Sequence, residues 1–266
     1  MIFKAISLIA VISFSLSSHV FAQTSTHDID QYRAMLADDN PAELYVAAGE
    51  ELWKKHSGPK NTTLEQCDFG LGSGILQGAA AQLPRYFKDS HRVQDLESRI
   101  ITCMVTLQGF SKSEIIQESF GKGIRKDIEA LSAYIASLSR GEKIKVTARH
   151  PKEKEMRAIG EKIFFYRSAA MDFSCATCHS ENNKRIRLQE LANLTEHEDA
   201  ARVWGTWPAY RVSNGELWTM QHRLNDCYRQ QRMPYLIYDS DVSIALSVFM
   251  ASKANGGVFD APGLKR

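Results

Sequence analysis

The segment Ser174-Cys175-Ala176-Thr177-Cys178-His179 holds the only C-x-x-C-H motif in the chain. Two cysteines separated by two residues and followed directly by a histidine are the attachment signature of a c-type haem. Cys175 and Cys178 would form thioether bonds to the porphyrin, and His179 would be the proximal ligand of the iron. The motif therefore predicts one covalently bound haem c.

Two other kinds of site use a C-x-x-C pair. A structural zinc site needs a second pair of ligands, and no other Cys or His doublet in the sequence has a suitable spacing. A thioredoxin-like redox motif has no use for the histidine and would follow a strand, whereas this motif follows a stretch with helical character. Haem attachment is therefore the preferred interpretation.

The N-terminal residues are typical of an export signal. Lys4 precedes an apolar stretch over residues 5–16, and small or apolar residues end at Ala22. The segment is too short and too rich in serine for a membrane anchor. We expect residues 1–22 to be a signal peptide and the mature chain to lie in the periplasm, where disulfides persist.

The charges of the chain are almost balanced. It has 33 Lys and Arg residues and 31 Asp and Glu residues, and Lys4 is the one basic residue that removal of the signal would take away. Net charge therefore gives no argument for electrostatic steering. We expect neither a nucleic acid nor a membrane among the partners.

The chain that would remain is too long for one small cytochrome c domain and suits two domains. Similar amphipathic helices are expected near the end of each half, at residues 130–137 (ALSAYIAS) and 245–252 (ALSVFMAS). Near the start of each half, another expected helix carries a glycine four residues before an aromatic residue. These pairs are Gly49 with Trp53 and Gly160 with Phe164.

A glycine lets a second helix cross at close range, which is how the first and last helices of a cytochrome c domain meet. We therefore predict an all-α fold with long irregular connections, built from two cytochrome c-like domains related by duplication. The expected domains are residues 23–148 and 149–266. The polar segment from Ser139 to Pro151 is the expected linker.

Each half also contains an Arg-x-x-x-Cys pattern. The two patterns are Arg99 with Cys103 and Arg223 with Cys227. On a helix, residues four apart share a face, so each guanidinium and its sulfur should project together. When the halves are matched, Cys67 takes the place of Cys175, but the second cysteine and the histidine are missing. We therefore expect haem in the second domain alone.

Five cysteines in an oxidising compartment leave one unpaired. With two bound to haem, Cys67 and Cys103 would face each other around the position that haem has vacated. We predict a disulfide between them, which would stabilise a domain without a cofactor by a few kcal/mol. Cys227 is then left over. A lone cysteine is most often buried and inert, but the arginines and tyrosine near Cys227 do not form an apolar environment.

Both halves resemble a known family, the catalytic A subunits of the SoxAX cytochromes of bacterial thiosulfate oxidation. The resemblance rests on the C-x-x-C-H motif, on Trp207-Pro208-Ala209-Tyr210-Arg211, and on Gln221-His222-Arg223-Leu224-Asn225-Asp226-Cys227-Tyr228-Arg229-Gln230. Some members carry two haems. Because it lacks the first C-x-x-C-H, this chain resembles the single-haem branch, in which a disulfide stands in the first domain.

The resemblance implies that Cys227 is the distal ligand of the haem iron and carries a persulfide, with Arg223 beside it in the substrate channel. It also implies the activity of an L-cysteine S-thiosulfotransferase, which joins thiosulfate oxidatively to a cysteine of the carrier protein SoxYZ. Two electrons would leave through haem to a c-type cytochrome acceptor. The implied partner in a heterodimer is SoxX, a small monohaem cytochrome.

The residue types suit that chemistry. A cysteine sulfur near iron and an arginine should ionise readily, and a persulfide is a stronger nucleophile than a thiol. Thiosulfate is a dianion whose oxygens suit a guanidinium, so Arg223 can orient it. Other basic residues would widen the positive field, although a run of charges is more often a solvated surface. They are Lys184, Arg185, Arg187 and Arg211.

Two alternatives stay open. The first is a periplasmic electron-transfer cytochrome c without sulfur-transfer activity, in which Met233, or less favourably Met220, is the distal ligand. Spacing alone does not separate Met233 from Cys227, and the resemblance favours Cys227. The second is a non-catalytic interaction subunit, in which the domain without haem only docks a partner. His222 could carry protons beside Arg223, but a structural role is expected.

Overall fold

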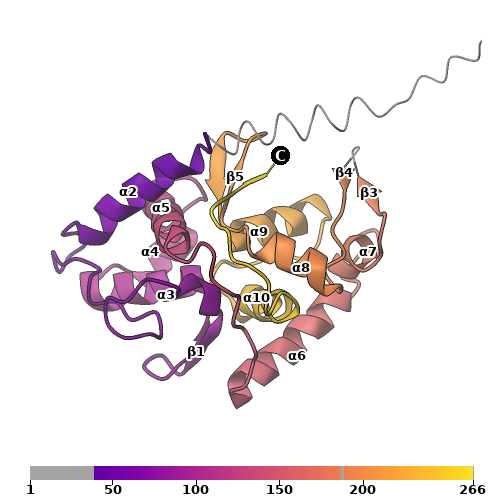
Figure 1. Ribbon diagram of the computed structural model, residues 1–266, viewed down its shortest axis with the longest axis horizontal. Coiled ribbons are helices and arrows are strands. Elements are labelled where there is room, and N and C mark those ends of the chain that lie inside the picture. The colour runs from indigo at the N-terminus through magenta and orange to yellow at the C-terminus, as the bar shows by residue number, and fades with distance from the viewer. Residues whose placement is uncertain (1–38, 187–188, 266) are drawn as a thin grey trace, which may run out of the picture. The chain divides into compact units, whose positions relative to one another are not determined.

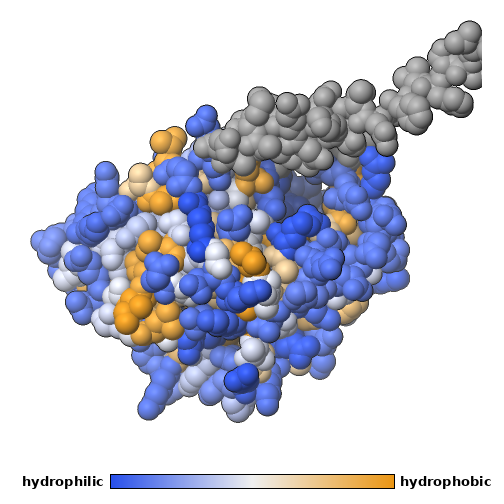
Figure 2. Space-filling view, in the orientation of Figure 1, coloured by the Kyte–Doolittle hydropathy of each residue, from blue (hydrophilic) through white to orange (hydrophobic). Residues whose placement is uncertain are grey.

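The computed structural model describes residues 39–186 and 189–265, which contain helices joined by long irregular connections and very short strands (Figure 1). The predicted signal peptide and Arg187 lie outside the described residues. Figure 2 shows one face of the protein as mostly hydrophilic, with hydrophobic side chains in separate patches. Within the described part of the chain, no helix is long and apolar enough to cross a membrane.

In the first half, the residues described from 39 onward contain four α-helices, two short helical segments and a β-hairpin in which β1 pairs with β2. Asp95 is the N-cap residue of α3, and its side chain accepts a hydrogen bond from the backbone N–H of Ser98. The bounds are α2 Ala42–Lys54, η1 Ala80–Gln82, β1 Arg85–Phe87, β2 Arg92–Gln94, α3 Leu96–Cys103, η2 Met104–Gln108, α4 Lys112–Gln117 and α5 Gly123–Ser137.

The second half combines helices with two small sheets. Their bounds are α6 Pro151–Phe165, α7 Cys175–His179, β3 Arg185–Ile186, β4 Gln189–Glu190, α8 His197–Trp204, β5 Ala209–Arg211, β6 Glu216–Trp218, α9 Met220–Gln230, α10 Asp241–Lys253 and β7 Gly263–Lys265. Strand β3 pairs with β4, and β5 lies between antiparallel β6 and parallel β7. The all-α prediction missed these strands because two or three residues are too few to show a strand periodicity.

The close helix crossings expected at two glycines are confirmed. A Cβ atom on Gly49 of α2 would lie 2.1 Å from the carbonyl oxygen of Ala130 in α5, and one on Gly160 of α6 would lie 1.9 Å from that of Ala245 in α10. Figure 1 shows the two crossings. Ala130 and Ala245 begin the two similar sequence segments, so the crossings have the same register in both halves. A larger residue could not approach this closely.

The connection between the halves is tightly packed. Residues 138–150 contain no helix or strand, but Ile144 and Val146 within them are 1% and 3% exposed. The backbone of residues 141–144 forms hydrogen bonds with residues 256–259 near the C-terminus. The polar composition that predicted a linker concealed these two apolar anchors, and the described residues pack as one unit.

A buried polar cluster joins the two halves around Gln221, in the first turn of α9. The side-chain nitrogen of Gln221 donates to both carboxylate oxygens of Asp95, at 3.1 and 2.9 Å, and its backbone N–H donates to Glu97 at 2.9 Å. Its side-chain oxygen accepts hydrogen bonds from the backbone of Asp239 and the hydroxyl of Ser243. All five residues are buried, so α9 is fixed against α3 by a largely satisfied polar network.

A cavity of about 40 Å³ lies beside this cluster, lined by Asp95 and Glu97 from one half and by Met220 and Trp207 from the other, among others. The Oε2 atom of Glu97 has no hydrogen-bond partner among the described residues. Burial, followed by the charge of Asp95, raises the pKa of Glu97 to about 8. Glu97 is therefore mostly protonated at neutral pH in the folded chain.

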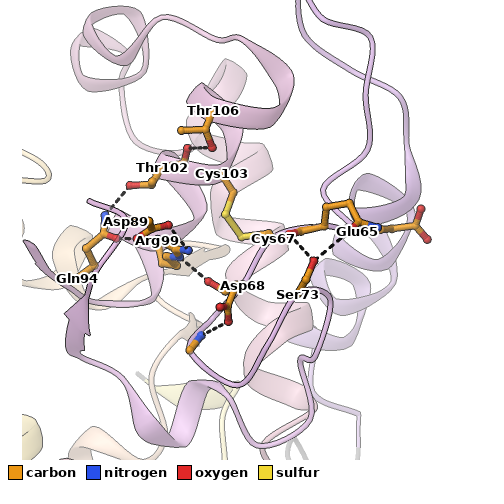
Figure 3. The surroundings of a disulfide bond; sticks show 12 residues. Glu65, Cys67, Asp68, Ser73, Asp89, Gln94, Arg99, Thr102, Cys103 and Thr106 are labelled. Carbon is orange, nitrogen blue, oxygen red and sulfur yellow. Dashed lines mark hydrogen bonds and ion pairs between the residues drawn. A yellow bond between two sulfur atoms is a disulfide. The ribbon is translucent and has the colours of Figure 1, made fainter. Parts of the chain in front are cut away.

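A disulfide joins Cys67 to Cys103, with the two Cα atoms 5.7 Å apart (Figure 3). Both cysteines are buried, and they lie 36 residues apart in the chain. Arg99, one turn before Cys103, lies 2.8 Å from a carboxylate oxygen of Asp89 and 4.1 Å from the centre of the Phe87 ring. In the first half, the cysteine of the Arg-x-x-x-Cys pair is thus held in a disulfide, and the arginine is held by an ion pair and an aromatic ring.

The buried Glu97 makes the stability of the protein depend on pH. Its pKa is higher in the folded chain than in the unfolded chain, so the stability it contributes is present at low pH and is lost as pH rises toward about 8. Between pH 6.5 and 8, the free energy of unfolding of the wild type should fall relative to that of Glu97→Gln by up to about 1.4 kcal/mol per pH unit. Urea unfolding across this range measures the difference.

His222, whose pKa burial lowers to about 4, is present in both proteins, so its own pH dependence cancels in the difference. Glu50, an exposed carboxylate paired with Lys54, is the matched control, and Glu50→Gln should follow the wild type at every pH. Parallel curves for the wild type and Glu97→Gln would contradict the assignment of a buried, protonated Glu97.

The helix crossings predict a large cost for one added methyl group. Gly160→Ala and Gly49→Ala should each lower the free energy of unfolding by about 3 kcal/mol, because the new Cβ overlaps a backbone carbonyl. Gly141→Ala is the control, since nothing lies within 4 Å of the added atom and only the positive φ of 81° opposes it. Denaturant unfolding tests this, and equal losses in all three variants would show that the crossings are not tight.

Candidate functional site

The C-x-x-C-H motif forms the short helix α7. The Ser174 hydroxyl accepts a hydrogen bond from the backbone of Thr177, and the Thr177 hydroxyl accepts one from the backbone of Ser174. This reciprocal cap starts the helix at Cys175. Cys175 and Cys178 therefore lie on one helical turn, and neither forms a disulfide.

His179 is oriented by a backbone carbonyl. Its Nδ1 donates to the carbonyl oxygen of Ala192 at 2.9 Å, which leaves the Nε2 lone pair available to a metal. Burial lowers the pKa of His179, so the ring is held in the neutral form that binds iron. The motif predicted the histidine, but nothing in the sequence pointed to Ala192 as its partner.

Cys227 lies close to the motif, near enough to interact electrostatically with Cys175 and Cys178. Burial raises the pKa of Cys227, while the guanidiniums of Arg223 and Arg211 act in the opposite direction. The sequence-based expectation that Cys227 ionises readily included the effect of a nearby iron. The protein side chains by themselves favour the neutral thiol form of Cys227.

Asp226 organises the charges along α9. Its carboxylate accepts hydrogen bonds from Arg223 at 3.0 Å, from Arg229 at 2.7 Å and from Gln230 at 2.6 Å. The Arg223 side chain nevertheless remains 28% exposed, so its guanidinium can meet a ligand from solvent. Asp226 was not predicted as a site residue. Its spacing of three residues from an arginine on either side was the signal that could have revealed it.

Of the other basic residues proposed from the sequence, only one of those described shares the surroundings of Cys227. Lys184 lies 3.1 Å from Glu181 at the surface, and Arg185 is exposed on β3. Arg211, on β5, interacts electrostatically with Arg223 and Cys227. The positive field at the sulfur therefore comes from α9 and β5.

The two methionine candidates both pack against the apolar cluster that also contacts Cys175. Met220 in addition lines the cavity beside Glu97. Met233 follows α9, and its backbone N–H donates to the carbonyl of Tyr228 at 2.9 Å. Met233 thus shares an apolar cluster with Cys175, and Cys227 interacts electrostatically with both cysteines of the motif.

His222 is held between two aromatic rings. Its ring centre lies 4.1 Å from that of Phe120 and 4.2 Å from that of Trp218. Burial lowers its pKa to about 4, and its Nδ1 atom, 3.8 Å from a Glu129 oxygen, has no hydrogen-bond partner within the described ranges. A neutral, stacked imidazole is a packing element, which supports the structural role expected for His222.

The residues present fit a covalently attached haem. Cys175 and Cys178 offer two thiols on one turn, His179 offers an oriented imidazole, and the sulfur of Cys227 lies nearby. The described residues contain no group of three or more His, Cys, Asp or Glu side chains that could hold a metal ion by themselves. Ala176 of α7 belongs to a large apolar cluster that also contains Phe164, Leu194, Leu224, Tyr228, Leu246 and Phe249, and Cys175 packs against this cluster.

Comparisons with known proteins agree with these features. A family model described as the SoxA/TsdA cytochrome c domain matches residues 48–144, in the half without the C-x-x-C-H motif. The structure resembles the crystal structure of SoxXA from P. pantotrophus, with a TM-score of 0.73 and 22% identity over 89% of this chain and 84% of that chain. The protein thus has a cytochrome c-like fold.

Two curated relatives match almost the full length. The chain is 34% identical to the L-cysteine S-thiosulfotransferase subunit SoxA of Hydrogenobacter thermophilus, over 99% of this chain and 98% of that protein. It is 53% identical to the protein of the same name from Hydrogenophilus thermoluteolus, over 99% of each chain. An identity of this size over the whole length shows that the chain belongs to the SoxA family.

Proposed function

We propose that the chain is an L-cysteine S-thiosulfotransferase, which couples thiosulfate oxidatively to a cysteine of the carrier protein SoxYZ. The observation that carries the proposal is the position of Cys227 and Arg223 beside the C-x-x-C-H helix, in a chain that is 53% identical to a protein of that name. Neither a plain electron carrier nor a docking subunit needs a buried cysteine flanked by two arginines.

The reaction joins two sulfur atoms. The carrier thiol R–SH and thiosulfate, S–SO₃²⁻, form the S-thiosulfonate R–S–S–SO₃⁻ with loss of one proton and two electrons. A haem held by Cys175, Cys178 and His179 would supply the redox centre that takes these electrons, one at a time, toward a c-type cytochrome acceptor.

The residues of the chain supply binding and the sulfur nucleophile. Arg223 donates to the sulfonate oxygens and offsets the repulsion between the dianion and an ionised sulfur. Asp226 fixes the guanidinium by its 3.0 Å hydrogen bond. Cys227 would be the distal ligand and, as a persulfide, a better sulfur acceptor than a thiol.

The same proposal includes two cytochrome c-like domains, residues 23–148 and 149–266, related by duplication, with haem in the second alone. Three observations support it. The helix crossings have the same register, the first half pairs Cys67 with Cys103 where the second has Cys175 near Cys227, and the family model matches within the first half.

The proposed partners are SoxX, in a heterodimer, and SoxYZ, with the complex in the periplasm. The resemblance to a structure described as SoxXA supports the first partner. Thiosulfate presented together with a carrier cysteine requires a second, transient contact. Neither a nucleic acid nor a membrane is part of this proposal.

One haem per chain is the expected stoichiometry. A pyridine haemochrome assay on the mature chain should give one haem, because Cys67 is bonded to Cys103, and Gly70 and Leu71 stand where a C-x-x-C-H motif beginning at Cys67 would have its second cysteine and its histidine. Two haems per chain would exclude the proposed domain assignment.

The distal ligand separates sulfur transfer from simple electron transfer. A thiolate or persulfide donates strongly and lowers the haem potential, whereas a methionine thioether raises it. We expect a low-potential, low-spin haem whose spectrum changes in Cys227→Ala and does not change in Met233→Leu. Optical and paramagnetic resonance spectra measure both effects.

Arg223→Ala tests anion binding separately from haem ligation, because Arg223 is proposed to bind thiosulfate and not the haem. The haem spectrum of Arg223→Ala should stay nearly intact, while thiosulfate turnover falls. An unchanged spectrum in Cys227→Ala together with a lost distal ligand in Met233→Leu would instead identify an electron-transfer cytochrome c.

A further inference from the structure

Arg211 lies on β5, the central strand of the three-stranded sheet, and forms no ion pair with any carboxylate of the described residues. Its Nε atom is buried and lacks a hydrogen-bond partner among residues 39–186 and 189–265. The residue opposite it on β6 is Glu216, whose carboxylate accepts a hydrogen bond from the Trp218 indole at 3.4 Å. Burial and the nearby charge of Arg223 lower the pKa of Arg211.

A stack of rings holds the Arg211 guanidinium in place. Trp218 pairs with Ala209, two residues before Arg211, so the two side chains lie on the same face of the sheet. The guanidinium carbon lies 5.2 Å from the centre of a Trp218 ring. Trp218 stacks on His222, and His222 stacks on Phe120 of the first half. Arg211 is thus supported from across the boundary between the halves.

The charges around Cys227 are unbalanced. Arg211 and Arg223 both act on the sulfur, and the carboxylate that acts with them is Asp226. Asp226 is already shared between Arg223, Arg229 and the Gln230 amide. Asp226 forms ion pairs with Arg223 and Arg229, whereas its effect on Arg211 is through space, and a partly desolvated positive charge such as that of Arg211 is stabilised by an added anion.

We propose that Arg211 binds the sulfonate oxygens of thiosulfate together with Arg223, so that the dianion is held between two guanidiniums beside Cys227. This assignment rests on the proposed function and adds a second binding residue to it. Arg223 comes from α9 and Arg211 from β5, so the two can approach one anion from different elements. Trp218 is the positioning residue, because it fixes the guanidinium of Arg211.

Equilibrium dialysis of radiolabelled thiosulfate against the oxidised holoprotein, without the carrier protein, tests the assignment. Removal of a charge-assisted hydrogen bond in Arg211→Gln should raise the dissociation constant about tenfold or more, while the haem spectrum stays unchanged. Arg211→Lys should bind with intermediate affinity, because it keeps the charge and loses the planar fork. Arg185→Gln removes an equal charge from the exposed strand β3 and should bind thiosulfate like the wild type.

Trp218 gives an independent pair of variants that leave Arg211 in place. Trp218→Phe keeps a ring under the guanidinium and should retain affinity, whereas Trp218→Leu should weaken thiosulfate binding. If Arg211→Gln does not accumulate as holoprotein, this pair decides the question, and equal affinities of the two variants would overturn the assignment.

The outcomes separate this inference from the function on which it rests. Wild-type affinity in Arg211→Gln, combined with loss of turnover in Cys227→Ala, would remove Arg211 from the site and leave sulfur transfer intact. Full turnover in Cys227→Ala would instead refute the proposed function, whatever the affinity of Arg211→Gln.

Discussion

The position of the site depends on one buried amide. Gln221 lies between Asp95 and Glu97 of the other half and uses both ends of its side chain and its backbone N–H in hydrogen bonds. Buried polar groups that lose a partner carry a full desolvation cost, so this network tolerates few arrangements. Because Arg223 and Cys227 follow on the same helix, a half with no C-x-x-C-H motif determines where they lie.

The Arg-x-x-x-Cys pattern occurs in both halves, but its arginine and cysteine have different partners in each. In the first half, Cys103 is consumed in a disulfide, and Arg99 is buried against Asp89 (Figure 3). In the second half, Cys227 is free of disulfides, and Arg223 keeps an exposed part despite its pairing with Asp226. The disulfide stabilises the first half by restricting its unfolded state. In the second half, the cysteine keeps a free sulfur and the arginine keeps contact with solvent.

Features carried by short stretches of sequence could be predicted. The C-x-x-C-H motif occupies one helical turn, and the glycines at Gly49 and Gly160 mark confirmed helix crossings, because each signal depends on neighbouring residues or on a repeated segment. The polar cluster could not be predicted. Asp95 and Glu97 are 126 and 124 residues from Gln221, and no local spacing links them.

In the candidate site too, local sequence signals could be used for prediction, and tertiary contacts could not. Arg223 and Cys227 share a helix, so their spacing of four residues predicted that they lie on one face. Arg211 lies on a different element, and the orientation of its side chain depends on the strand pairing of β5 and on the Trp218 ring next to its guanidinium. The polar composition of the predicted linker, Ser139 to Pro151, gave no sign that Ile144 and Val146 within it are buried. Tertiary contacts decide such positions, and a single sequence does not contain them explicitly.

Strand β7 is the last described element of the chain, and it is the parallel neighbour of β5. The tail that precedes it also closes over the connection between the halves. The pairing of β5 with β6 is local in sequence, whereas the pairing of β5 with β7 closes a loop that contains α9 and α10. Closing a longer loop costs more entropy, so we expect the strand that carries Arg211 to acquire β6 before β7 during folding.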